Sequence, residues 1–199
     1  MRIVFFLALM FAARLGYAQG AYNEIAEASR DTMKEAGMSF RLPNEKWRLV
    51  DSGGSDVKRY VFNREELTDS LGRSSAAAIV VAVEDAKNYN GDLILYSTSI
   101  RVDLSNNIAI DIKEVLSWET KDWPLPYKNA VFYKASYSEN VLEHLLYMIH
   151  IINKHNKGIQ IYMDMPQSLA AGYEHEFIDF LKSVKEVERK LSPKKKGKK

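Results

Sequence analysis

Residues 143–165 read EHLLYMIHIINKHNKGIQIYMDM, and this stretch decides the fold. Two runs of alternating apolar residues flank a polar turn at residues 154–157, a pattern typical of an antiparallel hairpin. Matching the two apolar faces fixes the parity of the register, because a slip of one residue would bring Gln160 and Asp164 onto the apolar face. That face comprises Leu145, Tyr147, Ile149 and Ile151 on the first strand and Ile159, Ile161, Met163 and Met165 on the second.

Residues 75–84 predict a central strand of the same sheet. One face of this run consists of Ile79, Val81 and Val83, and the other face consists of alanines and Val80. Apolar residues on both faces indicate a strand that is covered on both sides. The small side chains of the alanine face would let a helix approach closely.

Shorter alternating runs predict four more strands, at residues 38–42, 47–50, 57–63 and 129–137, with a polar loop at residues 65–73. Helical spacing predicts three helices, at residues 21–36, 107–119 and 169–184. The middle helix is predicted from apolar residues at i, i+4, i+7 and i+8, namely Ile108, Ile112, Val115 and Leu116. Residues 85–107 fit a helix and a strand equally well.

The order of these elements predicts the fold class. Strands are grouped between helices and do not alternate with them strictly, which favours an α+β domain. We therefore expect a mostly antiparallel sheet, sandwiched by an N-terminal helix, a middle helix and a long C-terminal helix. The domain is predicted to span residues 19–189.

Two short patterns frame the predicted domain. Phe40-Arg41-Leu42-Pro43, with Trp47 four residues further on, is similar to an opening strand with its Pro–Trp corner. Residues 159–166 are similar to a closing strand, and the helix after them carries Phe177, Phe180, Leu181 and Ser183.

Together these patterns resemble the αβα sandwich of PsbP-like photosystem extrinsic proteins and of Ran-release-factor proteins of the Mog type. The resemblance implies an αβα sandwich. It also implies a binding or assembly role in place of catalysis, because the superfamily includes many such proteins. It carries over no functional residue, since neither pattern contains one.

Residues 1–18 predict a secretory signal peptide that does not belong to the fold. Arg2 supplies a positive charge, residues 3–13 are uninterrupted apolar residues, and Gly16 and Ala18 suit a signal-peptidase site. The run is shorter than the roughly 20 apolar residues that a membrane span requires. An uncleaved anchor and a buried N-terminal strand stay open as alternatives. Since the chain has no cysteine and no Asn-x-Ser/Thr acceptor, we expect a periplasmic or secreted bacterial protein with no transmembrane span after cleavage.

Charge is distributed unevenly along the chain, although 28 basic and 26 acidic residues give a net charge of only +2. Residues 190–199 hold six lysines and no acid, whereas residues 19–189 carry 20 basic and 26 acidic residues. We expect a disordered cationic tail that adheres to anionic lipid or envelope polymer. Export and the absence of aromatic residues between the lysines argue against nucleic acid as a partner. The residues expected to make this contact are Lys194, Lys195, Lys196, Lys198 and Lys199.

A search for reaction chemistry finds no local signature. The chain lacks a Gly-x-Ser-x-Gly elbow, a phosphate loop, a Gly-x-Gly-x-x-Gly turn and a His-Glu-x-x-His helix. We therefore expect no catalytic residue, no cofactor and no metal site.

The predicted ligand-binding residues form two groups. Trp118, Trp123 and Tyr127 surround two prolines in a loop, where large rings would stack on a sugar or anchor a protein partner. The alternative is that these rings cap the end of the core.

The second group lies on the strand face opposite the apolar one. His150, Tyr162 and Asp164 share that face, and such a group could move a proton or hold a metal. The alternative is a partly exposed polar sheet face with ordinary cross-strand hydrogen bonds. On the final helix, His175 and Asp179 have metal-ligand spacing, but a solvated helix face explains them better.

These observations favour an exported, non-catalytic protein that binds a protein or cell-envelope component. Two alternatives stay open: an envelope hydrolase that uses His150, Tyr162 and Asp164, and a surface-adhesive protein that acts through its lysine tail. The sequence does not predict an oligomeric state.

Overall fold

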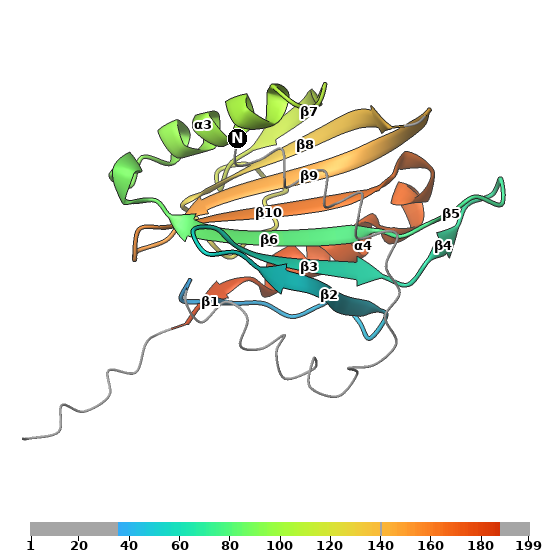
Figure 1. Ribbon diagram of the computed structural model, residues 1–199, viewed down its shortest axis with the longest axis horizontal. Coiled ribbons are helices and arrows are strands. Elements are labelled where there is room, and N and C mark those ends of the chain that lie inside the picture. The colour runs from blue at the N-terminus through green and yellow to red at the C-terminus, as the bar shows by residue number, and fades with distance from the viewer. Residues whose placement is uncertain (1–35, 140, 188–199) are drawn as a thin grey trace, which may run out of the picture.

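The computed structural model describes residues 36–139 and 141–187, which form one large sheet, two α-helices and two small strand pairs (Figure 1). The strands are β1 Met38–Ser39, β2 Trp47–Gly53, β3 Lys58–Arg64, β4 Leu67–Thr68, β5 Ser74–Ser75, β6 Ala78–Asp85, β7 Asp111–Leu116, β8 Ala130–Glu139, β9 Leu142–Ile152, β10 Lys157–Pro166 and β11 Lys185–Glu186. The helices are α3 Leu93–Ser105, α4 Gln167–Ser183 and the short 3-10 helix η1 Lys87–Tyr89.

The large sheet is antiparallel throughout and has the strand order β2-β3-β6-β10-β9-β8-β7. Its centre contains the hairpin predicted from residues 143–165, as strands β9 and β10. Ile149 lies opposite Ile161 and Tyr147 lies opposite Met163, so the predicted matching of the two apolar faces is confirmed. The predicted central strand is β6, which pairs with β10 on one side and with β3 on the other.

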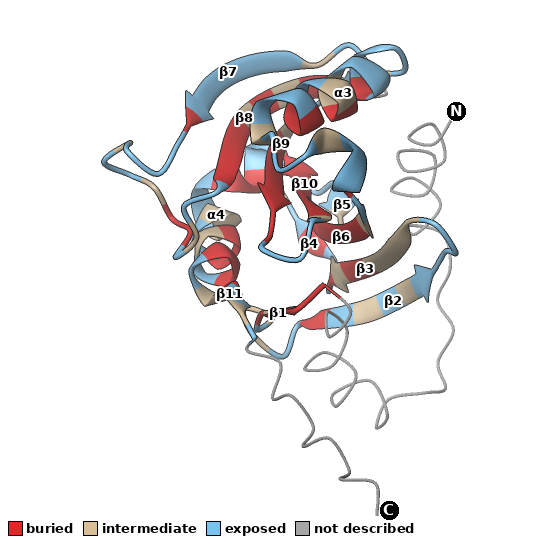
Figure 2. Ribbon diagram, turned by 90° about the vertical axis from the view of Figure 1, so that its left-hand side faces the viewer, coloured by how far each residue is buried: buried red, intermediate tan, exposed pale blue. Residues whose placement is uncertain are grey.

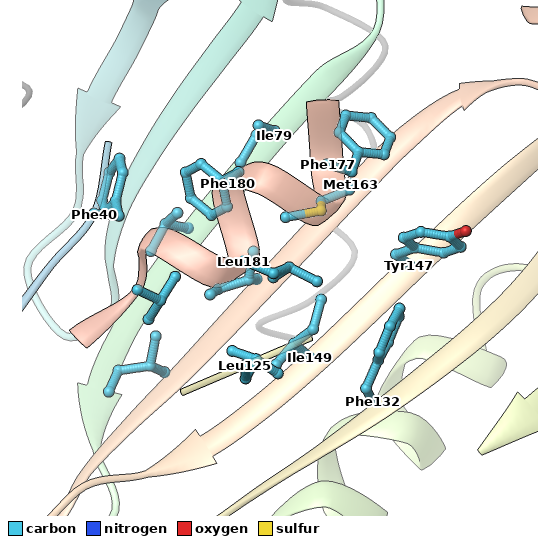
Figure 3. Packing of buried hydrophobic residues seen from close by; sticks show 14 of the residues in the cluster. Phe40, Ile79, Leu125, Phe132, Tyr147, Ile149, Met163, Phe177, Phe180 and Leu181 are labelled. Carbon is cyan, nitrogen blue, oxygen red and sulfur yellow. The ribbon is translucent and has the colours of Figure 1, made fainter. Parts of the chain in front are cut away.

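The sheet carries a helix on each face, and each helix covers its own apolar core (Figure 2). On one face, α4 packs Phe177 and Phe180 against the apolar residues of β6, β9 and β10 (Figure 3). On the other face, α3 packs Tyr96, Ile100 and Leu104 against the alternate residues of the same strands. The predicted α+β class with a mostly antiparallel sheet is therefore confirmed, and α4 lies where the final helix was predicted.

The predicted helix at residues 107–119 is wrong, because its centre forms the edge strand β7. The register of β7 shifts between Ile112 and Glu114, so Lys113 is the extra residue of a β-bulge. Ile112 and Val115 consequently face the same side of the sheet, opposite residues of the α3 core. A bulged strand thus reproduces the three-residue spacing that is otherwise typical of a helix.

The helix on this side of the sheet is α3, which lies within residues 85–107, the stretch whose sequence fitted a helix and a strand equally well. Asp92 caps its first turn, since its Oδ1 accepts a hydrogen bond from the backbone N–H of Leu95 over 2.9 Å. The predicted helix at residues 21–36 lies outside the described residues except for Ala36, so the expected arrangement of three helices is not confirmed. The predicted signal peptide and the lysine tail also lie outside the described residues.

A buried ion pair joins α4 to strands β2 and β3. Arg64 donates hydrogen bonds to both carboxylate oxygens of Glu176, over 2.9 and 3.0 Å, and the Trp47 indole donates a third over 2.6 Å. Burial on its own raises the pKa of Glu176, but the hydrogen bonds from Arg64 and Trp47 outweigh it and hold that pKa below its usual value. The charge of Glu176 is therefore retained in the folded protein.

Helix α3 approaches the sheet closely at one glycine. The ring of Tyr96 lies on Gly158, and a Cβ atom at that position would be 2.5 Å from the Tyr96 Cζ and hydroxyl oxygen. The Tyr96 hydroxyl donates a hydrogen bond to Glu84 over 3.0 Å, which fixes the ring. Gly158 is therefore required for the contact between helix and sheet.

Replacing Gly158 with alanine should destabilise the protein. The new methyl group would displace the Tyr96 ring, and overpacking of this kind costs about 1–3 kcal/mol. Gly172→Ala is the matched control, because Gly172 lies on the exposed side of α4 with nothing within 4 Å of its Cβ position. That variant should be neutral or about 0.5–1 kcal/mol more stable. Urea unfolding followed by circular dichroism measures both changes, and equal stability of the two variants would contradict the close approach.

Candidate functional site

An open groove lies between the edge strand β7 and the start of helix α4. Its volume is about 530 Å³, and it combines residues of three strands with residues of the helix. The lining residues are Lys113 and Glu114 of β7, Lys134 of β8, Leu145 and Tyr147 of β9, and Gln167, Ala170 and Glu174 of α4.

Lys134 is the charged centre of this groove. Its ammonium nitrogen lies 3.4 Å from a carboxylate oxygen of Glu114 and 3.9 Å from one of Glu174. The same nitrogen lies 5.7 Å from the ring centroid of Tyr147, whose hydroxyl donates a hydrogen bond to Glu174. The groove therefore presents cations and anions within one small surface above the buried Tyr147 ring, which suits a ligand that carries both positive and negative groups.

The groove is not predicted from the sequence, although one signal for it is present there. Along β8, Phe132 and Lys134 share a face, because Phe132 lies opposite Ile149 and Lys134 opposite Tyr147. On this face the row changes from Ala130 and Phe132 to Lys134, Ser136 and Ser138, and a change from apolar to polar residues indicates where the sheet extends beyond the helix that covers it. Lys134 was overlooked because β7, which supplies Glu114, was assigned to a helix.

Trp118 is the exposed ring of the predicted aromatic group. Trp118 lies just beyond the end of β7 and is 48% exposed. The Lys128 ammonium nitrogen lies 4.5 Å from the centroid of its ring. A cation over the face of an indole ring stabilises the ring's position by electrostatic attraction. Trp118 thus presents a large apolar surface at the same edge of the sheet as the groove.

Trp123 and Tyr127 are partly buried and pack against the α4 core. The Trp123 indole donates a hydrogen bond to the Tyr127 carbonyl over 3.2 Å, and the Tyr127 hydroxyl donates to Glu186 over 3.2 Å. Burial and the adjacent Glu186 carboxylate raise the pKa of Tyr127, so its hydroxyl stays protonated. These two rings hold the loop onto the domain, and the three aromatic residues do not form one exposed cluster.

His150 lies in the core beneath α3 and not on the partly exposed face that the sequence suggested. Its Nδ1 lies 2.8 Å from the Ser97 hydroxyl, which is 2.7 Å from the Tyr133 hydroxyl. Its Nε2 is buried and has no hydrogen-bond partner among the described residues. Burial, with a smaller contribution from the Arg101 charge, lowers the pKa of His150 to about 3, so the imidazole is neutral.

Tyr162 and Asp164 are buried on the same face but make separate contacts. The Tyr162 hydroxyl donates to Gln160 over 2.7 Å, and the ring centroids of Tyr162 and His150 are 6.2 Å apart. Asp164 accepts a hydrogen bond from the Tyr137 hydroxyl over 3.0 Å and lies 3.0 Å from Nδ1 of His144. The predicted group is therefore brought to one face, but its three members have different hydrogen-bond partners: Ser97 for His150, Gln160 for Tyr162, and Tyr137 and His144 for Asp164.

The buried networks leave little chemistry available to an external substrate. A general acid or base has to come within hydrogen-bond distance of its substrate. Ser97 is 1% exposed and His150 is fully buried, and neither the groove nor a small cavity beside Pro166 is lined by either residue. The hydrogen bonds of this arrangement instead link polar groups within the α3 core to one another.

His175 and Asp179 are exposed on α4, and Asp179 lies 3.6 Å from Lys182. Within residues 36–139 and 141–187, no three His, Asp or Glu side chains are grouped so that they could hold a metal ion.

In the same part of the chain, no helix is long and apolar enough to cross a membrane.

Comparison with known proteins finds likeness at the level of fold. No protein-family model and no curated protein matches the chain. A Pseudomonas aeruginosa protein of unknown function, described as a putative regulator, has a TM-score of 0.49 and 11% identity over 68% of this chain and 87% of its own. LpqN of Mycobacterium tuberculosis, involved in cell envelope biogenesis, has a TM-score of 0.49 and 12% identity over 76% of this chain and 84% of its own. Neither is described as PsbP-like, so that resemblance stays a prediction.

The pH dependence of stability should report the buried state of His150. The pKa of this histidine is 6.5 when unperturbed and about 3 in the folded protein, so only the unfolded chain takes up its proton between those values. The contribution to stability is therefore complete above pH 6.5 and is lost as the pH falls toward 3. Between pH 7 and pH 4.5, His150→Gln should lose roughly 2–3 kcal/mol less unfolding free energy than the wild type, measured by urea unfolding.

His175→Gln provides the control, because His175 is exposed on α4. Its unfolding free energy should follow the wild-type pH dependence. If His150→Gln shows the same dependence as the wild type, His150 is not held neutral in the folded protein.

Proposed function

We propose that this protein is an exported, non-catalytic binding protein of the bacterial cell envelope. It binds a protein or polymer of the envelope at the groove between β7 and α4, with the adjacent Trp118 ring as a second contact. The observation that carries the proposal is the groove itself, which presents charges of both signs at an open edge of the sheet.

Two features of this edge favour binding. Exposed tryptophan rings supply much of the energy where proteins bind partners, because they bury a large apolar area on contact. Trp118 is such a ring, and Lys128 restrains it. Lys134 and its two carboxylate neighbours supply polar contacts that fix the orientation of a ligand, whereas apolar contacts alone give little specificity.

Export is part of this proposal and depends on the signal-peptide pattern in residues 1–18. The lysines of residues 190–199 would add a weaker, salt-sensitive attraction to anionic envelope surfaces. This attraction would concentrate the protein near its partner, while the groove selects the partner. A role in hydrolysis is less well supported, because the residues proposed for it are buried beneath α3.

Trp118→Ala and Lys134→Met should each reduce capture of the partner several-fold. Both variants are made in the chain that begins at Gln19 and are used as bait for the envelope fraction of the source bacterium. The first change removes the exposed ring, and the second removes the central cation of the groove. Bound protein and glycan are quantified by mass spectrometry, and circular dichroism confirms that the variants are folded.

Leu71→Ala is the matched control, since Leu71 is an exposed apolar residue in the β4–β5 turn, outside the groove lining (Figure 1). Its capture should equal that of the wild type. Deleting residues 190–199 should weaken capture at low salt and preserve the difference between wild type and Trp118→Ala. Equal capture by Trp118→Ala, Lys134→Met and Leu71→Ala would contradict the proposed site.

A further inference from the structure

Strand β7 ends the large sheet, and no strand of the described residues pairs with its outer edge. Figure 2 shows β7 as an exposed strip beside the buried strand β8. Two of its exposed side chains are large and aliphatic, with Ile112 38% exposed and Val115 57% exposed. Such an edge presents backbone N–H and C=O groups that can pair with another strand.

The bulge sorts the side chains of β7 onto two faces. Ile112 and Val115 lie on the α3 side of the sheet, because both are opposite residues of the α3 core. Lys113 and Glu114 both line the groove on the α4 side. The strand therefore carries an apolar pair on one face and a pair of opposite charges on the other.

The sequence DIKEVL of β7 is complementary to itself when two copies run antiparallel. With the two strands centred on each other, Ile112 lies opposite Val115, Lys113 opposite Glu114, and Asp111 opposite Leu116. At the centre of the pair, apolar residues then meet each other on one face, and Lys113 meets Glu114 on the other. The two bulges lie opposite each other, so the pairing on either side of them keeps the same register. We propose that β7 pairs with β7 of a second copy in a two-fold symmetric dimer.

The charges select this register over its neighbours. A shift of one residue in one direction places Lys113 opposite Lys113, and a shift in the other direction places Glu114 opposite Glu114. Like charges directly opposite each other destabilise a strand pair. A lysine on an edge strand usually prevents pairing with another chain. Here Lys113 meets a carboxylate of the second copy, and the symmetry forms each contact twice.

Pairing of this kind would also place two grooves side by side. Directly opposite residues of paired strands point to the same side of a sheet, so both copies keep α4 on the same side. Lys113 and Glu114 form the β7 side of each groove, and the two grooves therefore adjoin across the seam. The paired stretch ends at Leu116, which leaves Trp118 outside it. The dimer does not depend on the proposed function.

A charge swap tests the pairing. The chain from Gln19 is expected to show a concentration-dependent monomer–dimer equilibrium by analytical ultracentrifugation. Lys113→Glu and Glu114→Lys should each weaken dimerisation at least tenfold, because each creates two like-charge pairs. The double variant Lys113→Glu/Glu114→Lys restores opposite charges across the seam and should restore the dimer. Circular dichroism verifies the fold of all variants.

Cysteine pairing tests the register independently, because the chain contains no cysteine. An oxidised mixture of Ile112→Cys and Val115→Cys chains should form a disulfide-linked heterodimer in much higher yield than either variant alone. A wild-type chain that stays monomeric at all concentrations overturns the inference, as does a double charge variant that fails to recover the dimer. Either result leaves the groove proposal intact, and loss of Trp118-dependent capture would leave the dimer intact.

Discussion

The structure depends on one constraint, which is that its central strands are apolar on both faces. β6 and β10 present alternate residues to two separate cores, so the sheet is stable in water only when a helix covers each side. Helix α4 meets this requirement on one face, where the Arg64–Glu176 ion pair fixes it to the outer strands. Helix α3 meets it on the other face, where Gly158 lets the Tyr96 ring lie directly on the sheet.

The same constraint explains which features followed from the sequence and which did not. The central hairpin was predicted with its apolar faces correctly matched because its period of two is unbroken over both strands. β7 was mistaken for a helix because one extra residue, Lys113, gives a strand the spacing of a helix. His150 was expected on a half-exposed face because α3 had not been placed above it. Alternation identifies the two faces of a strand, but burial depends on elements from elsewhere in the chain.

Covering both faces moves the accessible surface to the edge of the sheet. The polar side chains on the α3 side of the sheet, among them His150, Tyr162 and Asp164, are buried. They form hydrogen bonds with neighbouring residues of the sheet and with α3. Beyond α4, the sheet continues to β8 and β7, where Lys134 and its partner Glu114 are reached from outside. The groove, the Trp118 ring and the unpaired strand edge all lie in this region, so ligand binding and self-association would share one margin of the domain.

The most direct test of this account is the reactivity of the histidines in the folded protein toward diethyl pyrocarbonate, read by peptide mass spectrometry. His155 and His175 are exposed, and the account predicts that both are modified. It predicts that His144 and His150 stay unreactive until the chain is unfolded, since both are fully buried. Modification of His150 in the folded protein at the rate seen for His175 would contradict the account, because the α3 face would then admit small molecules.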